Sequence, residues 1–180
     1  MPKNGEFLYW IILFSDKSKY MKITNVECYA LLIPDFDADA CSSAQDNLVV
    51  KISTDTGLYG IGETDTNPWG VKAIIDAPGT HAIGRGFKEL LIGKDPRNVE
   101  GLWYELNEKT MMTSRRGLGI CAIGAVDMAL WDLCGKIYEQ PTWKLLGGSV
   151  KEYIYPYASL LPEGDNLKDY SDSLVDKVTK

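Results

Sequence analysis

One helical stretch constrains the fold of this chain more than any other feature, the run CAIGAVDMALWDLCGKIYEQP over residues 121–141. Large apolar side chains recur along it at the spacing of one helix face, at Ile123, Val126, Leu130, Cys134 and Ile137. A second face carries small side chains, at Ala122, Ala125 and Ala129. Small side chains let another helix or strand approach closely, and Pro141 ends the pattern. The sequence therefore predicts a helix with two packing faces.

Three segments before this helix alternate apolar and polar residues with the period of a half-buried strand, over residues 22–32, 47–53 and 58–64. A long loop separates the first segment from the second, and the turn TDTG, which ends at Gly57, separates the second from the third. This order of strands, loop and tight turn predicts a small antiparallel sheet.

Helical patterns follow the sheet. In the segment KDPRNVEGLWYELNEK we expect Asp95 to be the N-cap and Pro96 the first helical residue. The segment TWKLLGG adds one helical turn that ends at Gly147 and Gly148. Beyond it, YIYPYASLL predicts a strand, and NLKDYSDSLVDKVTK predicts an amphipathic helix.

These changes of pattern divide the chain into three parts. The apolar run FLYWIILF near the start is shorter than the ~20 residues that span a bilayer, and MKITNVE from Met21 reads like a natural start. We therefore expect an extension outside the fold at residues 1–20, an α+β domain at 21–150, and the start of a further domain at 151–180.

Composition excludes several classes of function. The chain has 180 residues, 45% of them hydrophobic, and a net charge of −6 with no basic stripe. We therefore expect no nucleic-acid partner and no anionic membrane partner. The four cysteines form no CxxC pair, and the chain has a single histidine, His81. Reduced, mostly buried thiols in a cytoplasmic protein are the interpretation that this pattern favours.

The segment PDFDADACSSAQD resembles the beginning of a calcium loop. An EF-hand loop takes ligands at positions 1, 3, 5 and 12 and glycine at position 6. Asp35, Asp37 and Asp39 fit the first three positions, but Ala40 stands at position 6 and Asp46 at position 12. The flanking segments are predicted strands, whereas an EF-hand needs helices. The alternative is a polar flap that covers a site elsewhere in the protein.

Other motifs favour structural roles. GLGICA spells a dinucleotide-binding fingerprint, but no strand precedes it, so we expect no dinucleotide site. We expect His81 to be a surface residue at a helix start. Asp127 and Asp132 lie five residues apart and do not share a helix face, so we expect them to form structural hydrogen bonds to a neighbouring loop.

The long helix and its surroundings resemble the mandelate racemase/muconate lactonizing enzyme branch of the enolase superfamily. The resemblance covers residues 21–161, and Thr142 departs from the aliphatic residue that is usual there. It rests mainly on these matching positions: Ala122, Gly124, Ala125, Val126, Asp127, Ala129, Leu130, Asp132, Leu133, Gly135, Lys136, Pro141, Leu145, Leu146 and Gly147.

The resemblance implies a fold and a chemistry. The fold is an α+β capping domain, with a three-stranded antiparallel sheet and helices, followed by the first strand–helix unit of a truncated (β/α)8-type barrel. Family members bind Mg²⁺ in the barrel and remove the proton alpha to a substrate carboxylate. The catalytic and metal-binding residues should lie later than Lys180, so we expect none of them in this chain and no activity from this chain alone. The parent enzyme is expected to be a homo-oligomer.

The resemblance also makes PDFDADACSSAQD a flap over the barrel mouth and TDTNPWG a second specificity loop. The residues that it suggests for contact with a small carboxylic acid are Asp35, Asp37, Trp69, Tyr157 and Ser159. Arg115 and Arg116 are candidates for an anion contact, although a subunit interface or the loop before a helix suits them better.

A flap rich in carboxylates, hydroxyls and amides suits a hydroxyl-rich substrate, because each buried hydroxyl needs a hydrogen-bond partner. The sequence thus favours an acid-sugar dehydratase. The alternatives are a racemase or cycloisomerase of the same superfamily, or a truncated, non-catalytic binding module.

Overall fold

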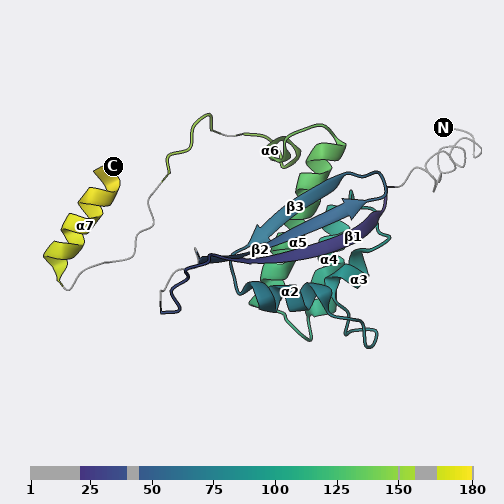
Figure 1. Cartoon of the computed structure of the whole chain (residues 1–180). Coiled ribbons are helices and arrows are strands. Elements are labelled where there is room, and N and C mark those ends of the chain that lie inside the picture. The colour runs from purple at the N-terminus through teal and green to yellow at the C-terminus, as the bar shows by residue number, and fades with distance from the viewer. Residues whose placement is uncertain (1–20, 40–44, 150, 157–165, 180) are drawn as a thin grey trace, which may run out of the picture. The chain divides into compact units, whose positions relative to one another are not determined.

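The computed structural model describes residues 21–39, 45–149, 151–156 and 166–179 (Figure 1). The chain forms two compact units that divide after Gly147. The first unit contains the sheet and the helices around it, and the second contains one helix near the C-terminus. The boundary expected at residue 150 lies close to this division and stays a prediction.

The sheet has three antiparallel strands in the order β1-β2-β3, as the sequence predicts. They are β1 (Ile23–Leu32), β2 (Asp46–Thr54) and β3 (Tyr59–Thr64). Tyr29 lies opposite Val49 in the first pair of strands, and Lys51 lies opposite Ile61 in the second. A turn closed by the hydrogen bond from the Thr54 amide to the Leu58 carbonyl (3.0 Å) joins β2 to β3.

The helices of the first unit lie on one face of this sheet, except the short last one, which packs against the long helix (Figure 1). They are α2 (Pro68–Asp76), α3 (Phe87–Leu91), α4 (Val99–Thr110), α5 (Leu118–Ile137) and α6 (Thr142–Leu145). Helix α5 begins three residues before the predicted pattern, and α6 ends before Gly147 and Gly148, whose φ angles of 108° and 92° only glycine adopts readily.

The two predicted faces of α5 are both buried. The apolar face that includes Ile123, Val126 and Leu130 joins the main core, and the alanine face has no exposed surface. Strand β3 packs against that alanine face, where it presents Gly60 and Gly62. By length and composition α5 could cross a membrane, but half of it is buried inside the domain, as expected of a core helix.

The close approach of β3 to α5 depends on the two glycines. A Cβ atom on Gly60 would lie 2.0 Å from the Ala129 carbonyl oxygen, and one on Gly62 would lie 2.0 Å from the Ala125 carbonyl oxygen. No side chain fits between the strand and the helix backbone. The expectation that small residues on the helix admit a close neighbour is confirmed, and the neighbouring strand also lacks side chains at Gly60 and Gly62.

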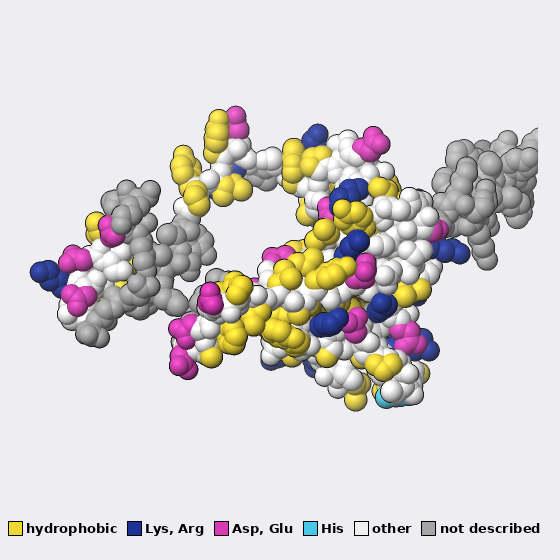
Figure 2. Space-filling model, in the orientation of Figure 1, with side chains coloured by type: hydrophobic (Ala, Val, Ile, Leu, Met, Phe, Trp, Pro, Cys, Tyr) yellow, Lys and Arg dark blue, Asp and Glu magenta, His cyan; other side chains and the backbone are white. Residues whose placement is uncertain are grey.

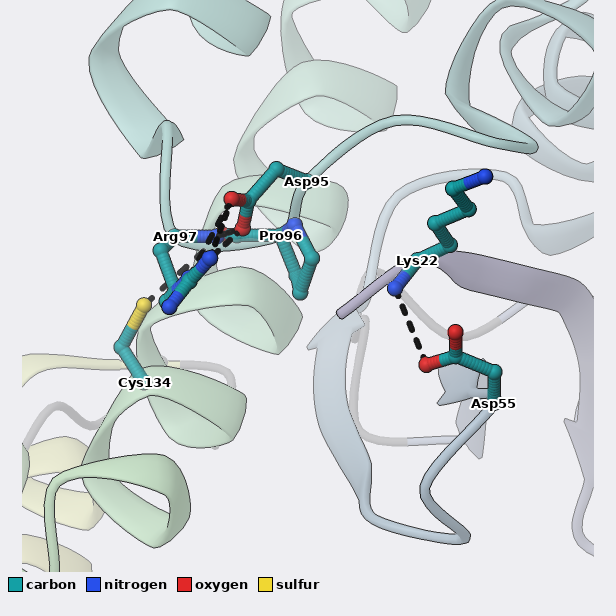
Figure 3. A network of polar contacts seen from close by, with 6 residues as sticks. All are labelled: Lys22, Asp55, Asp95, Pro96, Arg97 and Cys134. Carbon is teal, nitrogen blue, oxygen red and sulfur yellow. Dashed lines mark hydrogen bonds and ion pairs between the residues drawn. The ribbon is translucent and has the colours of Figure 1, made fainter. Parts of the chain in front are cut away.

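The segment before α4 differs from the prediction. Helix α4 begins at Val99 with Asn98 at the N-cap position, so Asp95 is not the cap and Pro96 is not the first helical residue. The Asp95 carboxylate instead accepts hydrogen bonds from the Arg97 amide (3.0 Å) and the Arg97 guanidinium (2.6 Å from Nη2 to Oδ2) (Figure 3). The Asp95 side chain thus forms hydrogen bonds within the local turn around Pro96 and does not cap α4.

This turn also contacts the long helix. The Cys134 thiol of α5 donates to the Pro96 carbonyl at 3.7 Å, so the turn is tied to the core (Figure 3). Hydrogen bonding to Arg97 holds the pKa of Asp95 below its ordinary value, despite an opposing effect of burial. Because the folded pKa is lowered, the charged carboxylate stabilises the fold above the unfolded pKa of ~4, and this stabilisation is lost as the pH falls.

Asp95→Asn is therefore expected to lower the free energy of unfolding at pH 7 by about 1–2 kcal/mol. The difference between variant and parent should shrink as the pH falls below ~4, where the parent carboxylate also becomes neutral. Urea unfolding at pH 7 and pH 3.5 checks this. A difference that stays the same at both pH values would contradict the role given to the charge.

The second unit contains helix α7 (Leu167–Thr179), which confirms the amphipathic helix expected there. The strand expected over YIYPYASLL is not seen in its described part, because residues 153–156 belong to no strand. A strand exists only through its hydrogen-bonded neighbour, and the described residues offer none at this point. The rest of that segment lies outside the described residues.

Candidate functional site at the loop end of the sheet

Two loops lie beyond the same end of the sheet. The register pairs Leu32 with Asp46 at the end of β1, and Leu48 with Thr64 at the end of β3. The β1–β2 loop and the β3–α2 loop therefore leave the sheet side by side (Figure 1). These are the two loops that the sequence predicts as the flap and the second specificity loop.

The described part of the flap is fixed by one glutamine. The Gln45 side-chain oxygen accepts from the Asp37 amide at 2.6 Å, and the Gln45 side-chain nitrogen donates to the Asp37 carbonyl at 2.8 Å. At the base of the loop, the Ile33 amide donates to the Gln45 carbonyl at 2.9 Å. The Gln45 side chain therefore bonds both backbone groups of Asp37, as a residue of a neighbouring strand would, and fixes the chain at Asp37.

Asp37 is also engaged by its own loop, because its carboxylate accepts from the Asp39 amide at 2.9 Å. Asp35 is exposed. The root of the flap is more apolar than the sequence argument assumed, since Leu32, Ile33 and Phe36 are 42%, 45% and 50% exposed. The flap therefore presents an apolar root together with carboxylates.

The second loop continues directly into α2. Asn67 adopts a left-handed conformation (φ 40°), and its side chain accepts from the Gly70 amide at 2.9 Å, while Pro68 occupies the first turn. This arrangement leaves the Trp69 side chain 55% exposed. The Asn-Pro pair could have predicted the start of α2 from sequence, whereas no sequence signal indicated the role of Gln45.

Of the predicted substrate contacts, Asp35 and Asp37 lie on the flap, and Trp69 lies in the first turn of α2, directly after the second loop. Tyr157 and Ser159 lie outside the described residues. No ligand tests these roles, so all five stay predictions.

The family description "Mandelate racemase / muconate lactonizing enzyme, N-terminal domain" matches residues 30–147. The chain belongs to this family. Its sheet and helices are the N-terminal capping domain of the enolase superfamily, and the flap and the second specificity loop both lie inside the matched residues.

Curated relatives within the family include acid-sugar enzymes. A D-galactonate dehydratase family member of Marinomonas sp. (strain MWYL1) is 42% identical over 113 residues, which is 62% of this chain and 26% of the relative. The D-galactarolactone cycloisomerase of Agrobacterium fabrum (strain C58 / ATCC 33970) is 31% identical over 157 residues, which is 85% of this chain and 39% of the relative.

Solved structures of the family agree with the fold. The 3,6-anhydro-D-galactonate cycloisomerase from Zobellia galactanivorans is 33% identical with a TM-score of 0.62, over 76% of this chain and 34% of that one. The chain thus spans well under half the length of the relatives that it matches.

Within the mandelate racemase/muconate lactonizing enzyme family, magnesium is the expected metal. In the part of this chain that the structure describes, no three histidine, cysteine, aspartate or glutamate side chains come together as a metal site. These residues do not fit the ion, so no step that involves magnesium is assigned to them.

Two aspartates of α5, Asp127 and Asp132, were expected to have structural roles. Asp132 accepts hydrogen bonds from the Ile61 amide (2.8 Å) and from Lys136 (2.7 Å), which confirms a structural role, although its partner is a strand and not a loop. Asp127 is half-buried, and burial, followed by repulsion from Glu100, raises the pKa of its carboxyl.

His81 is exposed, as predicted, but it does not lie at a helix start, and that part of the prediction is wrong. The Gly84 amide donates to the His81 carbonyl at 3.1 Å and closes a tight turn, while the exposed imidazole Nδ1 lies 2.8 Å from the Thr80 hydroxyl. The glycine allows the chain to reverse direction before a helix can begin.

Three of the four cysteines are within the described residues and are free thiols: Cys28, Cys121 and Cys134. Burial, with a smaller effect of Asp76, raises the pKa of the Cys28 thiol to about 11. Burial also raises the pKa of the Cys134 thiol. Cys28 and Cys134 are therefore protonated at neutral pH and poor nucleophiles.

Proposed function

We propose that this chain is the substrate-selecting cap of a magnesium-dependent acid-sugar dehydratase, which removes the proton alpha to a carboxylate and eliminates water. The single observation that carries the proposal is the 42% identity to a D-galactonate dehydratase family member over 113 residues. An L-rhamnonate dehydratase and a D-mannonate dehydratase also match this chain, at 33% identity over 112 residues and 39% identity over 111 residues.

In this proposal the two loops bind and enclose the substrate and do not perform the proton transfer. The flap root around Ile33 and Phe36 excludes water, while Asp35 offers acceptors to substrate hydroxyls. Gln45 keeps the flap backbone in place, which lowers the entropy that would otherwise be lost when a substrate is enclosed. Magnesium, bound by the barrel, would stabilise the negative charge formed on the substrate carboxylate.

A second candidate function is cycloisomerisation of a sugar lactone. The specific observation that favours it is the D-galactarolactone cycloisomerase of Agrobacterium fabrum, whose similarity extends over 85% of this chain. Both reactions begin with removal of a proton alpha to a carbonyl group, so the cap alone does not distinguish them. The mass balance distinguishes them, because the dehydratase releases water from a sugar acid, whereas the cycloisomerase opens a lactone to a product of the same mass.

The test is a chimera in which residues 21–147 replace the equivalent domain of the Marinomonas relative. We expect the purified chimera, with Mg²⁺, to convert at least one acid from a panel of sugar acids into a 2-keto-3-deoxy acid. The chimera with Asp35→Ala is expected to raise KM at least several-fold with a smaller effect on kcat, because Asp35 contacts substrate and takes no part in chemistry.

The control is the unmodified relative, assayed on the same panel. A folded chimera that binds Mg²⁺ and dehydrates no sugar acid would contradict the proposal. Lactone isomerisation without dehydration would favour the second candidate function.

A further inference from the structure

Strand β3 is an edge strand among the described residues, and two side chains of α5 bind its outer edge. The Asp132 carboxylate accepts from the Ile61 amide at 2.8 Å, and the Lys136 ammonium donates to the Tyr59 carbonyl at 2.8 Å. The two side chains are also joined to each other, since Lys136 Nζ lies 2.7 Å from Asp132 Oδ2. Edge amides and carbonyls normally remain available to water or to another strand.

The geometry is that of an added parallel strand. In a parallel ladder, one residue of the neighbouring strand accepts from residue i+1 and donates to residue i−1. Here the carboxylate of Asp132 takes the acceptor position opposite Ile61, and the ammonium of Lys136 takes the donor position opposite Tyr59. The joined pair therefore fills the hydrogen-bonding positions that one residue of a fourth strand would occupy.

Asp132 and Lys136 of α5 can reach the edge of β3 because the strand packs closely on the helix. Because Gly60 and Gly62 have no side chains, the strand lies directly on the α5 backbone, and a carboxylate with a single methylene reaches around the edge. The aliphatic stem and ammonium of Lys136 pass beside the Tyr59 ring, with Nζ 4.7 Å from the ring centroid. This cation–π contact fixes the lysine further.

We propose that Asp132 and Lys136 close the β3 edge and prevent it from pairing with the β3 edge of a second copy of this chain. A two-fold pairing centred on Ile61 would set Ile61 beside its counterpart and Tyr59 beside Glu63 of the other copy, an apolar contact flanked by polar ones. Tyr59 and Ile61 are 44% and 45% exposed. Figure 2 shows apolar side chains gathered over the sheet face that is turned to the viewer. Without the pair, this edge is suited to self-association.

The other edge of the sheet has a related device. Lys72 of α2 donates to the Cys28 carbonyl of β1 at 3.1 Å and is itself paired with Asp76 at 2.6 Å. At the beginning of β1, the Ile23 amide donates to the Lys94 backbone carbonyl at 2.9 Å, and the Ile23 carbonyl accepts from the Gly93 amide at 2.8 Å. Charged side chains from the helices thus bind both edge strands, and the sheet is expected to stop at three strands.

The test is the double variant Asp132→Ala, Lys136→Ala in the full chain, compared with the parent by sedimentation velocity over a range of concentrations. We expect its dimer association constant to rise at least 10-fold. The control, Lys94→Ala with Glu105→Ala, removes an exposed ion pair of 2.9 Å with the same change in charge and is expected to leave association unchanged.

A third variant identifies the surface. Adding Ile61→Pro to the double variant removes the edge amide, and proline is tolerated at an outward-facing edge position, so association should return to the parent level. A folded double variant that associates no more than the parent would overturn the proposal, as would association that survives Ile61→Pro.

If the double variant does not fold, the association of the Lys136→Met variant is measured instead. This variant keeps the aliphatic stem of the side chain and the hydrogen bond between Asp132 and Ile61. A smaller rise in association is expected from it. No rise would overturn the proposal.

Discussion

Replacing Gly62 by alanine is expected to lower the free energy of unfolding by about 3 kcal/mol or more, at the upper end of overpacking effects. The added Cβ would lie 2.0 Å from the Ala125 carbonyl oxygen and 2.7 Å from the Ala129 amide nitrogen. These are backbone atoms of a 20-residue helix, so no side-chain rotation relieves the contact, and α5 must move away from the sheet. Urea unfolding followed by circular dichroism measures the loss.

Gly124→Ala is the matched control, because it adds the same methyl group to α5 at a position outside the contact with β3. Gly124 lies inside α5, and a Cβ there would meet nothing within 4 Å. It should therefore stabilise the protein by about 0.5–1 kcal/mol, since alanine restricts the unfolded chain and favours the helix. Equal effects of the two substitutions would contradict the account of the strand–helix contact.

Phe87→Ala should have an effect of similar size, a loss of about 3–5 kcal/mol. Phe87 is fully buried and begins α3, a helix of only five residues that depends on packing for its stability. The cavity cannot close easily, because a Cβ on the preceding Gly86 would lie 2.3 Å from the Ala77 carbonyl oxygen, which shows how tightly the chain is held there.

The control for Phe87 is Ile92→Ala in the next turn. The Ile92 side chain is 45% exposed, so its truncation should change the stability much less, by about 0.5–1 kcal/mol. Both variants are compared by urea midpoint and by thermal unfolding. A loss below 1 kcal/mol for Phe87→Ala would mean that α3 is not integral to the core.

The sheet and the long helix could be predicted from sequence because their signals were local and repeated. Alternation identified the strands within one residue at most boundaries, and the alanine face of α5 predicted its close neighbour. The errors occurred where one short polar contact decides the conformation. Asp95 had the sequence of a helix cap, but its bond to Arg97 two residues on was preferred.

The candidate site was predicted less completely than the fold. Its two loops were expected from resemblance, and the strand register explains why they emerge together. The clamp between Gln45 and Asp37 could not be predicted, because it joins residues eight positions apart across a loop without periodicity. Asn67 could have been recognised, since asparagine before proline is a common start for a helix.

The placement of both loops on the central strand has a consequence for how selectivity could be re-engineered. Strand β2 pairs at Asp46 with one loop's root and at Leu48 with the other's, only two residues apart. A shift of β2 by one residue in register would displace the bases of both loops at the same time and would move the β2 side chains to the opposite face of the sheet. An exchange of substrate preference between homologous proteins should therefore succeed when both loops are transferred together with β2, and it should fail when only one loop is transferred.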